Sequence, residues 1–138
     1  MNLSVFLILF STYMFSQTTI SKNVFGQPLI PCCYEPMTGF YRDGFCKTDK
    51  QDRGTHVVCA VMTKEFLDYT TSCGNDLCTP IPAYNFPGLQ PSDKWCLCIS
   101  RWLQAEKAGK APKIILEATS EIALDYTTIE LLIKYASK

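Results

Sequence analysis

The 138-residue chain lacks an excess of charge of either sign. Its 13 Lys and Arg residues balance its 13 Asp and Glu residues, so no net field would concentrate phosphate backbones or anionic lipid head groups at its surface. A nucleic-acid partner is therefore not expected. The sequence also lacks a nucleotide-binding glycine loop, a metalloprotease helix motif and a catalytic-triad signature, and so names no reaction.

The chain has no apolar run long enough to cross a bilayer. The run from Leu3 to Phe15 covers 13 residues, fewer than the roughly 18 that a membrane helix needs. Polar residues follow it, with Ser16 at a suitable cleavage point. We therefore expect a signal peptide at 1–16, a short linker at 17–22 and one globular domain at 23–138. A domain exported in this way is periplasmic or secreted, with no stable membrane span after cleavage. Alternatively the apolar run belongs to the fold, and the protein is cytoplasmic.

Histidine is scarce and cysteine is abundant. The chain has one histidine, His56, and eight cysteines. Cysteines form lasting disulfides in an oxidising compartment and stay reduced in the cytosol. Export therefore favours a disulfide-stabilised domain.

Glycine and proline recur in residues 22–56 and 74–94, which predicts turns and long loops there. Elsewhere, apolar runs and cap residues predict short elements. These are strands at 57–62, 95–100 and 113–118, and helices at 64–72 (capped by Thr63), at 101–108 and from Thr127 onward. Too few crossovers are present for a parallel sheet. The pattern predicts an α+β fold with a small mixed sheet, a few short helices and long Pro/Gly-rich loops.

Several separate blocks along the chain together resemble one bacterial family, the domain of unknown function 2237. The blocks are TGFYRDGFC (38–46), HVVCAVMTKEF (56–66), GNDLCTP (74–80), FPGLQPSDKWCLC (86–98) and LEAT (116–119). The resemblance carries no activity, cofactor or catalytic residue. It does imply a division of the cysteines. Members are short chains without a signal that keep the cysteines matching Cys32, Cys46, Cys59, Cys96 and Cys98, whereas Cys33, Cys73 and Cys78 are additions here.

Two of the additional cysteines could form a bridge of their own. Cys73 and Cys78 bracket Gly74-Asn75-Asp76-Leu77, a tetrapeptide that favours a turn. We expect a disulfide between them in an oxidising compartment.

Cys96 and Cys98 stand two residues apart in a predicted strand, so their sulfurs should lie on the same side. Three interpretations follow. The pair binds zinc with two further ligands from Cys32, Cys46 or His56, it forms disulfides with Cys32 and Cys46, or its members are simply buried. For Cys59, inside an apolar strand, we expect simple burial as a free thiol.

A thiol nucleophile is a further hypothesis, and His56 would have to be its base. The nucleophile would be Cys46 or Cys96, with Asp43 or Asp76 as the orienting carboxylate. A lone histidine before a buried strand is more often structural, and the sequence favours that interpretation.

Two polar pairs flank the predicted loops and could line a pocket for a small ligand: Arg42 with Asp43, and Asn75 with Asp76. The interpretation we favour is that the aspartates bond to turn amides and that Arg42 pairs with a carboxylate. The sequence as a whole predicts an exported binding or structural module with an unidentified small-molecule or protein partner. The alternative is a zinc- or thiol-dependent site that uses Cys46, His56, Cys96 and Cys98 and could be enzymatic.

Overall fold

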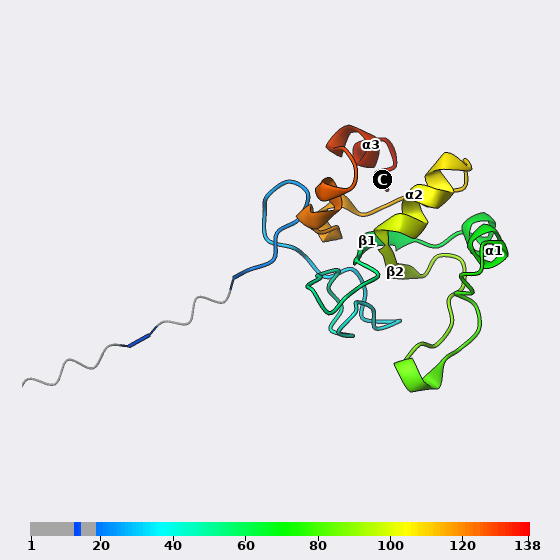
Figure 1. Ribbon diagram of the computed structural model, residues 1–138, viewed down its shortest axis with the longest axis horizontal. Helices are drawn as coiled ribbons and strands as arrows, with labels where there is room; N and C mark the ends of the chain where they lie inside the picture. Colours follow the sequence, from blue (N-terminus) through cyan, green and yellow to red (C-terminus); the bar gives the residue numbers. More distant parts are fainter. Residues whose placement is uncertain (1–12, 15–18) are drawn as a thin grey trace, which may run out of the picture.

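The structure, a computed structural model, describes residues 13–14 and 19–138. All but two residues of the predicted signal at 1–16 lie outside this part of the chain. The described part combines a two-stranded sheet with three short α-helices and long connections (Figure 1). The predicted α+β class is confirmed. None of the helices in the described residues is both long and apolar enough to cross a membrane.

The sheet pairs β1 (His56–Val61) with β2 (Lys94–Cys98) in antiparallel order. Cys59 lies opposite Cys96, and the register then shifts between His56 and Val58, so that His56 lies opposite Cys98. An extra residue of this kind is a β-bulge, which turns the side chains beyond it toward a different face. The bulge thereby brings the only histidine opposite Cys98.

The helices α1 (Lys64–Ser72), α2 (Ile99–Lys107) and α3 (Ile129–Lys134) lie close to their predicted positions. Thr63 caps α1 as predicted, because its hydroxyl accepts a hydrogen bond from the amide of Phe66. The cap of α3 is Thr128, one residue beyond the predicted Thr127. Helix α2 begins directly after β2, two residues earlier than predicted, so the second strand ends at Cys98.

The predicted strand at 113–118 is wrong. Ile114 forms only isolated bridges, to Ala60 and Ala136, and the chain then makes a 3-10 turn at Leu116–Ala118. The side chain of Thr119 takes the place of a ladder bond, because its hydroxyl accepts from the Cys59 amide and donates to the Ile115 carbonyl. The chain therefore follows the free edge of β1 without becoming a strand.

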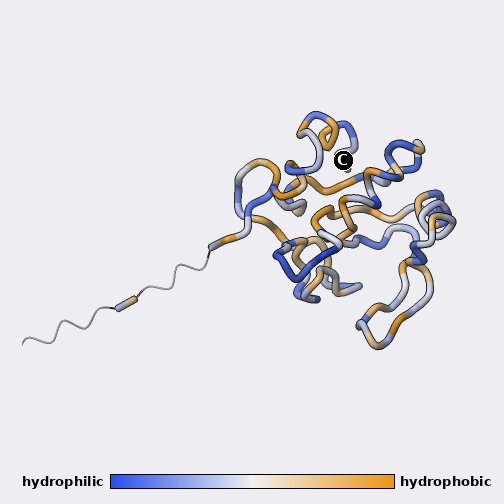
Figure 2. Tube along the Cα trace, viewed as in Figure 1, coloured by the Kyte–Doolittle hydropathy of each residue, from blue (hydrophilic) through white to orange (hydrophobic). Residues whose placement is uncertain are grey.

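The core lies between the sheet and the helices. Its largest fully buried side chains include Trp102 of α2, Phe66 of α1 and Met62 after β1. In Figure 2 the residues of β1 are apolar, whereas the segment 47–53 just before this strand is strongly hydrophilic. A second buried cluster consists of Cys32, Cys46, Cys59, Cys96 and Ala118.

Candidate thiol site beside a disulfide cluster

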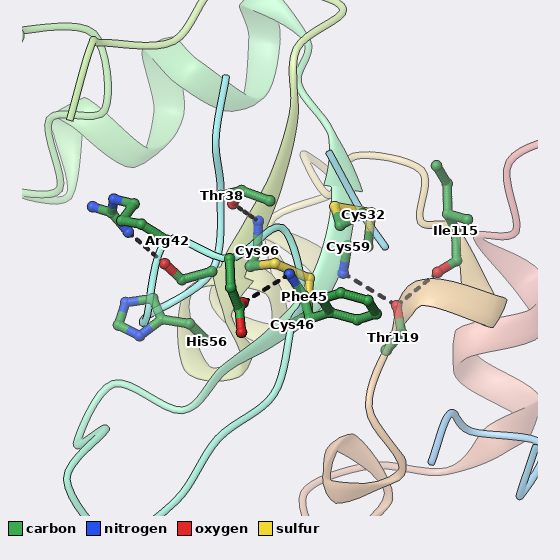
Figure 3. The surroundings of a disulfide bond; sticks show 12 residues. Cys32, Thr38, Arg42, Phe45, Cys46, His56, Cys59, Cys96, Ile115 and Thr119 are labelled. Carbon is green, nitrogen blue, oxygen red and sulfur yellow. Dashed lines mark hydrogen bonds between the residues drawn. A yellow bond between two sulfur atoms is a disulfide. The ribbon is translucent and has the colours of Figure 1, made fainter. Parts of the chain in front are cut away.

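Two disulfides join the loop-rich N-terminal segment to the sheet. Cys32 is bonded to Cys59 of β1, and Cys46 to Cys96 of β2. Because Cys59 and Cys96 are cross-strand neighbours, the two bridges lie side by side (Figure 3). The expectation that Cys59 is a free buried thiol is wrong, since its partner comes from a segment 27 residues away.

Cys73 and Cys78 are both free thiols, so the bridge predicted between them is not formed in the structure. The amide of Cys73 continues the turns of α1 by bonding to Tyr69 and Thr70 carbonyls. The amide of Cys78 instead bonds to the side chain of Asp76. The tetrapeptide between them does form a turn, but the amides of Cys73 and Cys78 make these hydrogen bonds and the two sulfurs are not joined.

The residues proposed as zinc ligands separate into two groups. The sulfurs of Cys32, Cys46 and Cys96 lie within 4.8 Å of one another, yet all three cysteines are disulfide-bonded. His56 and Cys98 contact each other instead. Zinc binding by these residues stays a prediction.

The second group forms a continuous chain of polar contacts. Cys98 Sγ lies 3.5 Å from His56 Nε2, and His56 Nδ1 lies 2.6 Å from Asp52 Oδ1. Asp52 is buried, and its other oxygen accepts 2.9 Å hydrogen bonds from the His56 amide and from the hydroxyl of Thr48. The carboxylate is therefore held from three sides and fixes the orientation of the imidazole ring.

Three features of the fold bring this chain of contacts together. The bulge in β1 places His56 opposite Cys98. Cys98 itself is both the last residue of β2 and the N-cap of α2, where it lies half-buried. The main chain of Gly54 packs against the pair: a Cβ at this position would come within 2.4 Å of His56 Cε1 and 2.9 Å of Cys98 Sγ.

The contacts change the protonation of the histidine. The hydrogen bond to Cys98, the charge on Cys98 and the contact with Asp52 together raise the pKa of His56 to about 9, against the opposing effect of burial. Its ordinary value is about 6.5. The ring is therefore an imidazolium at neutral pH, and this proton donor lies within reach of Cys98 Sγ.

A surface cavity of about 680 Å³ borders the same histidine. Its walls come from residues 40–42, from residues 75–77 and from Trp95 of β2. The remaining wall is the loop around η1 (Pro82–Tyr84), which projects from the body of the molecule in Figure 1. The lining is mostly apolar and aromatic, with four charged or amide side chains besides His56: Arg42, Asn75, Asp76 and Asn85.

A family model matches residues 22–136, and its description is "Uncharacterized protein conserved in bacteria (DUF2237)". The chain belongs to this family. The DUF2237 match contains both disulfides, the Cys98–His56–Asp52 contacts and the whole cavity. No curated protein matches the chain.

The four ligand-binding candidates have different surroundings in this DUF2237 chain. Arg42, Asn75 and Asp76 line the cavity, whereas Asp43 does not and forms an ion pair with Lys47. Asp76 accepts bonds from the amides of residues 78 and 79, as a turn aspartate should. Arg42 pairs with no carboxylate in the described residues, contrary to the interpretation we favoured. It donates to the carbonyls of residues 39, 84 and 85.

Sequence reasoning placed His56 and Cys98 in one candidate thiol-dependent site, but it named neither Cys98 as the nucleophile nor Asp52 as the orienting carboxylate. Cys46 and Cys96, the predicted nucleophiles, are bonded to each other, and the predicted orienting carboxylates Asp43 and Asp76 serve other contacts. Asp52 was missed. The available signal was the position of Asp52 four residues before His56 in a turn-rich segment, because an aspartate in a turn can accept hydrogen bonds from residues a few positions further along the chain.

Proposed function

We propose that Cys98 is the nucleophile of a thiol-dependent site whose reaction class is acyl transfer. His56 is its acid and base, and Asp52 holds the imidazole in place. The observation that carries the proposal is the unbroken series of contacts from Cys98 Sγ through His56 to the buried Asp52. A nucleophile, a base within reach and a group that orients the base are the three parts that covalent catalysis by cysteine requires.

The chemistry follows from the protonation states. The Cys98 thiolate attacks the carbonyl carbon of a substrate, a carbon–sulfur bond forms, and the imidazolium of His56 gives its proton to the leaving group as the bond to that group breaks. In the second half, a water attacks the S-acyl carbon while neutral His56 takes its proton. The carboxylic acid leaves, and the thiolate and imidazolium are restored.

The start of α2 supports the same assignment. Cys98 is the N-cap residue of this nine-residue helix, and no side chain caps the amides of the first turn. Such amides and the positive end of the helix dipole stabilise a thiolate. They also stabilise the negative oxygen that forms when a thiolate adds to a carbonyl.

The cavity supports a binding role for the domain, in accordance with the sequence-based expectation of a binding module. The two disulfides fit the exported location predicted from residues 1–16, because such bonds persist in oxidising compartments. Export thus remains part of the proposal, and the mass of the mature protein tests it.

The test of the thiol site is a competition among the four free cysteines for a limiting amount of iodoacetamide at pH 6. Ordinary thiols are largely protonated at this pH and react slowly. We expect Cys98 to be alkylated at least about tenfold faster than the exposed Cys78, as measured by peptide mass spectrometry.

The matched variant is His56→Gln, which keeps a polar side chain but removes the imidazolium. It should reduce the alkylation rate of Cys98 to that of Cys78 and leave Cys78 unchanged. Equal rates in the unmodified protein, or a Cys98 rate that does not depend on His56, would contradict the proposal.

A further inference from the structure

The cavity beside His56 contains a cation whose charge nothing in the described residues neutralises. The guanidinium of Arg42 lies 4.9 Å from the centre of the Trp95 ring. It donates one hydrogen bond each to the carbonyls of Gly39, Tyr84 and Asn85, and no carboxylate is within ion-pair distance of it among residues 19–138. Three of its five N–H groups are therefore used for positioning, and two remain for a ligand.

The charges around the cavity favour an anion. Arg42 lines the cavity without a carboxylate partner in the described part of the chain, whereas His56 is paired with the buried Asp52, and Asp76 is the only carboxylate in the lining. Both oxygens of Asp76 are already occupied, one by the amides of residues 78 and 79 and the other by the hydroxyl of Thr79. A ligand in the cavity thus meets Arg42, a cation without a carboxylate partner in this part of the chain, and one carboxylate whose oxygens already accept hydrogen bonds.

The backbone holds the arginine in place at a conformational cost. Arg42 has a φ of 53° and Asn85, whose carbonyl it contacts, has a φ of 49°. Non-glycine residues rarely adopt this left-handed conformation, and they keep it where the surrounding structure demands it. The cation is therefore fixed at the cavity wall, since its own turn and the η1 loop both bind it.

The remaining walls are suited to a flat apolar group. Five aromatic side chains line the cavity, and Phe86 and Trp95 pack edge to face with ring centres 5.3 Å apart. A cavity of about 680 Å³ is within the ordinary range for small-molecule sites. The five are Phe40, Tyr41, Tyr84, Phe86 and Trp95.

We infer that this cavity binds a small aromatic carboxylic acid or its derivative, with the carboxylate on Arg42 and the ring among the exposed aromatic side chains of the lining. These side chains are Phe40, Tyr41 and Tyr84. His56 borders both the cavity and Cys98. The binding of this ligand does not depend on the proposed function. Only the further step, that the ligand is the substrate of Cys98, rests on it.

The test compares 3-phenylpropionate with its neutral counterpart 3-phenylpropionamide by isothermal titration calorimetry on the full chain carrying Cys98→Ser. This variant cannot perform thiol chemistry, so a failure of the proposed function leaves the result unaffected. We expect the carboxylate to bind at least about tenfold more tightly than the amide, because the amide replaces a hydrogen-bonded ion pair with guanidinium by a hydrogen bond to a neutral oxygen.

Arg42→Gln should remove the preference while the amide still binds. Arg53→Gln, at an exposed arginine outside the cavity, should leave the preference intact. Equal affinities for the two compounds would overturn the inference, and so would a preference that survives Arg42→Gln. The comparison on the Cys98→Ser chain needs no change at Arg42, so it decides the matter even if the Arg42 variant fails to fold.

Discussion

Gly54→Ala separates Cys98 from His56 without removing either side chain. The added Cβ would lie 2.4 Å from His56 Cε1, 3.0 Å from His56 Nε2 and 2.9 Å from Cys98 Sγ. Ordinary contact begins at 3.4 Å, so the ring or the sulfur must move by about 1 Å. The present separation of 3.5 Å between Cys98 Sγ and His56 Nε2 cannot survive a shift of that size away from the glycine.

The expected effect is on reactivity more than on stability. Overpacking of this kind costs about 1–3 kcal/mol of unfolding free energy, whereas loss of the contact should lower the alkylation rate of Cys98 at pH 6 about tenfold or more. The rate is measured with iodoacetamide and peptide mass spectrometry, and stability by denaturant unfolding.

The control is Gly74→Ala. Gly74 has a φ of 84°, so alanine is strained there, but a Cβ would meet nothing within 4 Å. This variant should lose stability while Cys98 keeps its reactivity. If Gly54→Ala left the alkylation rate of Cys98 unchanged, the contact with His56 would not be what activates the thiol, and the reasoning would be refuted.

Two further predictions concern stability. The Cys46–Cys96 disulfide spans 50 residues, and its replacement by two alanines should lower the unfolding free energy by about 4 kcal/mol, whereas Cys73→Ser should change it little. Second, a pKa of His56 raised to about 9 gives a stabilisation that is complete below about pH 6.5 and is lost as the pH rises through 9. The shift corresponds to about 3 kcal/mol, reduced to about 1–2 kcal/mol because a third of the ring is exposed. Unfolding at pH 6 and pH 9.5 should show this loss in the natural protein and not in His56→Gln.

Local sequence signals predicted the elements that depend on neighbouring residues. Strand β1 follows from an unbroken apolar run, and α1 from Thr63 at its N-cap, because both patterns act within a few residues. The segment 113–118 has the same apolar character, but its conformation depends on Thr119, which bonds to Cys59 across a separation of 60 residues. A contact across so many residues does not alter the local pattern of apolar and polar residues, so this pattern could not predict it.

The candidate site likewise combines features that follow from neighbouring residues with features that depend on long-range contacts. The pattern of residues in WCLC left zinc binding, disulfides and simple burial open for its two sulfurs. Cys96 forms a disulfide with Cys46, whereas Cys98 is a free thiol beside His56. Which cysteine stays free could not be predicted, because this depends on the register shift in β1 that places His56 opposite Cys98. A bulge inserts one residue into a ladder, and periodicity alone does not locate it.

The most direct measurement of the central claim is the NMR titration of the His56 ring. As the only histidine in the sequence, it gives an unambiguous signal without a variant for assignment. The account predicts a pKa of about 9 in the natural protein, with the titration moving toward the ordinary 6.5 in Cys98→Ser because the sulfur is the largest cause of the shift. A titration near 6.5 in the natural protein would contradict the pairing of Cys98 with His56.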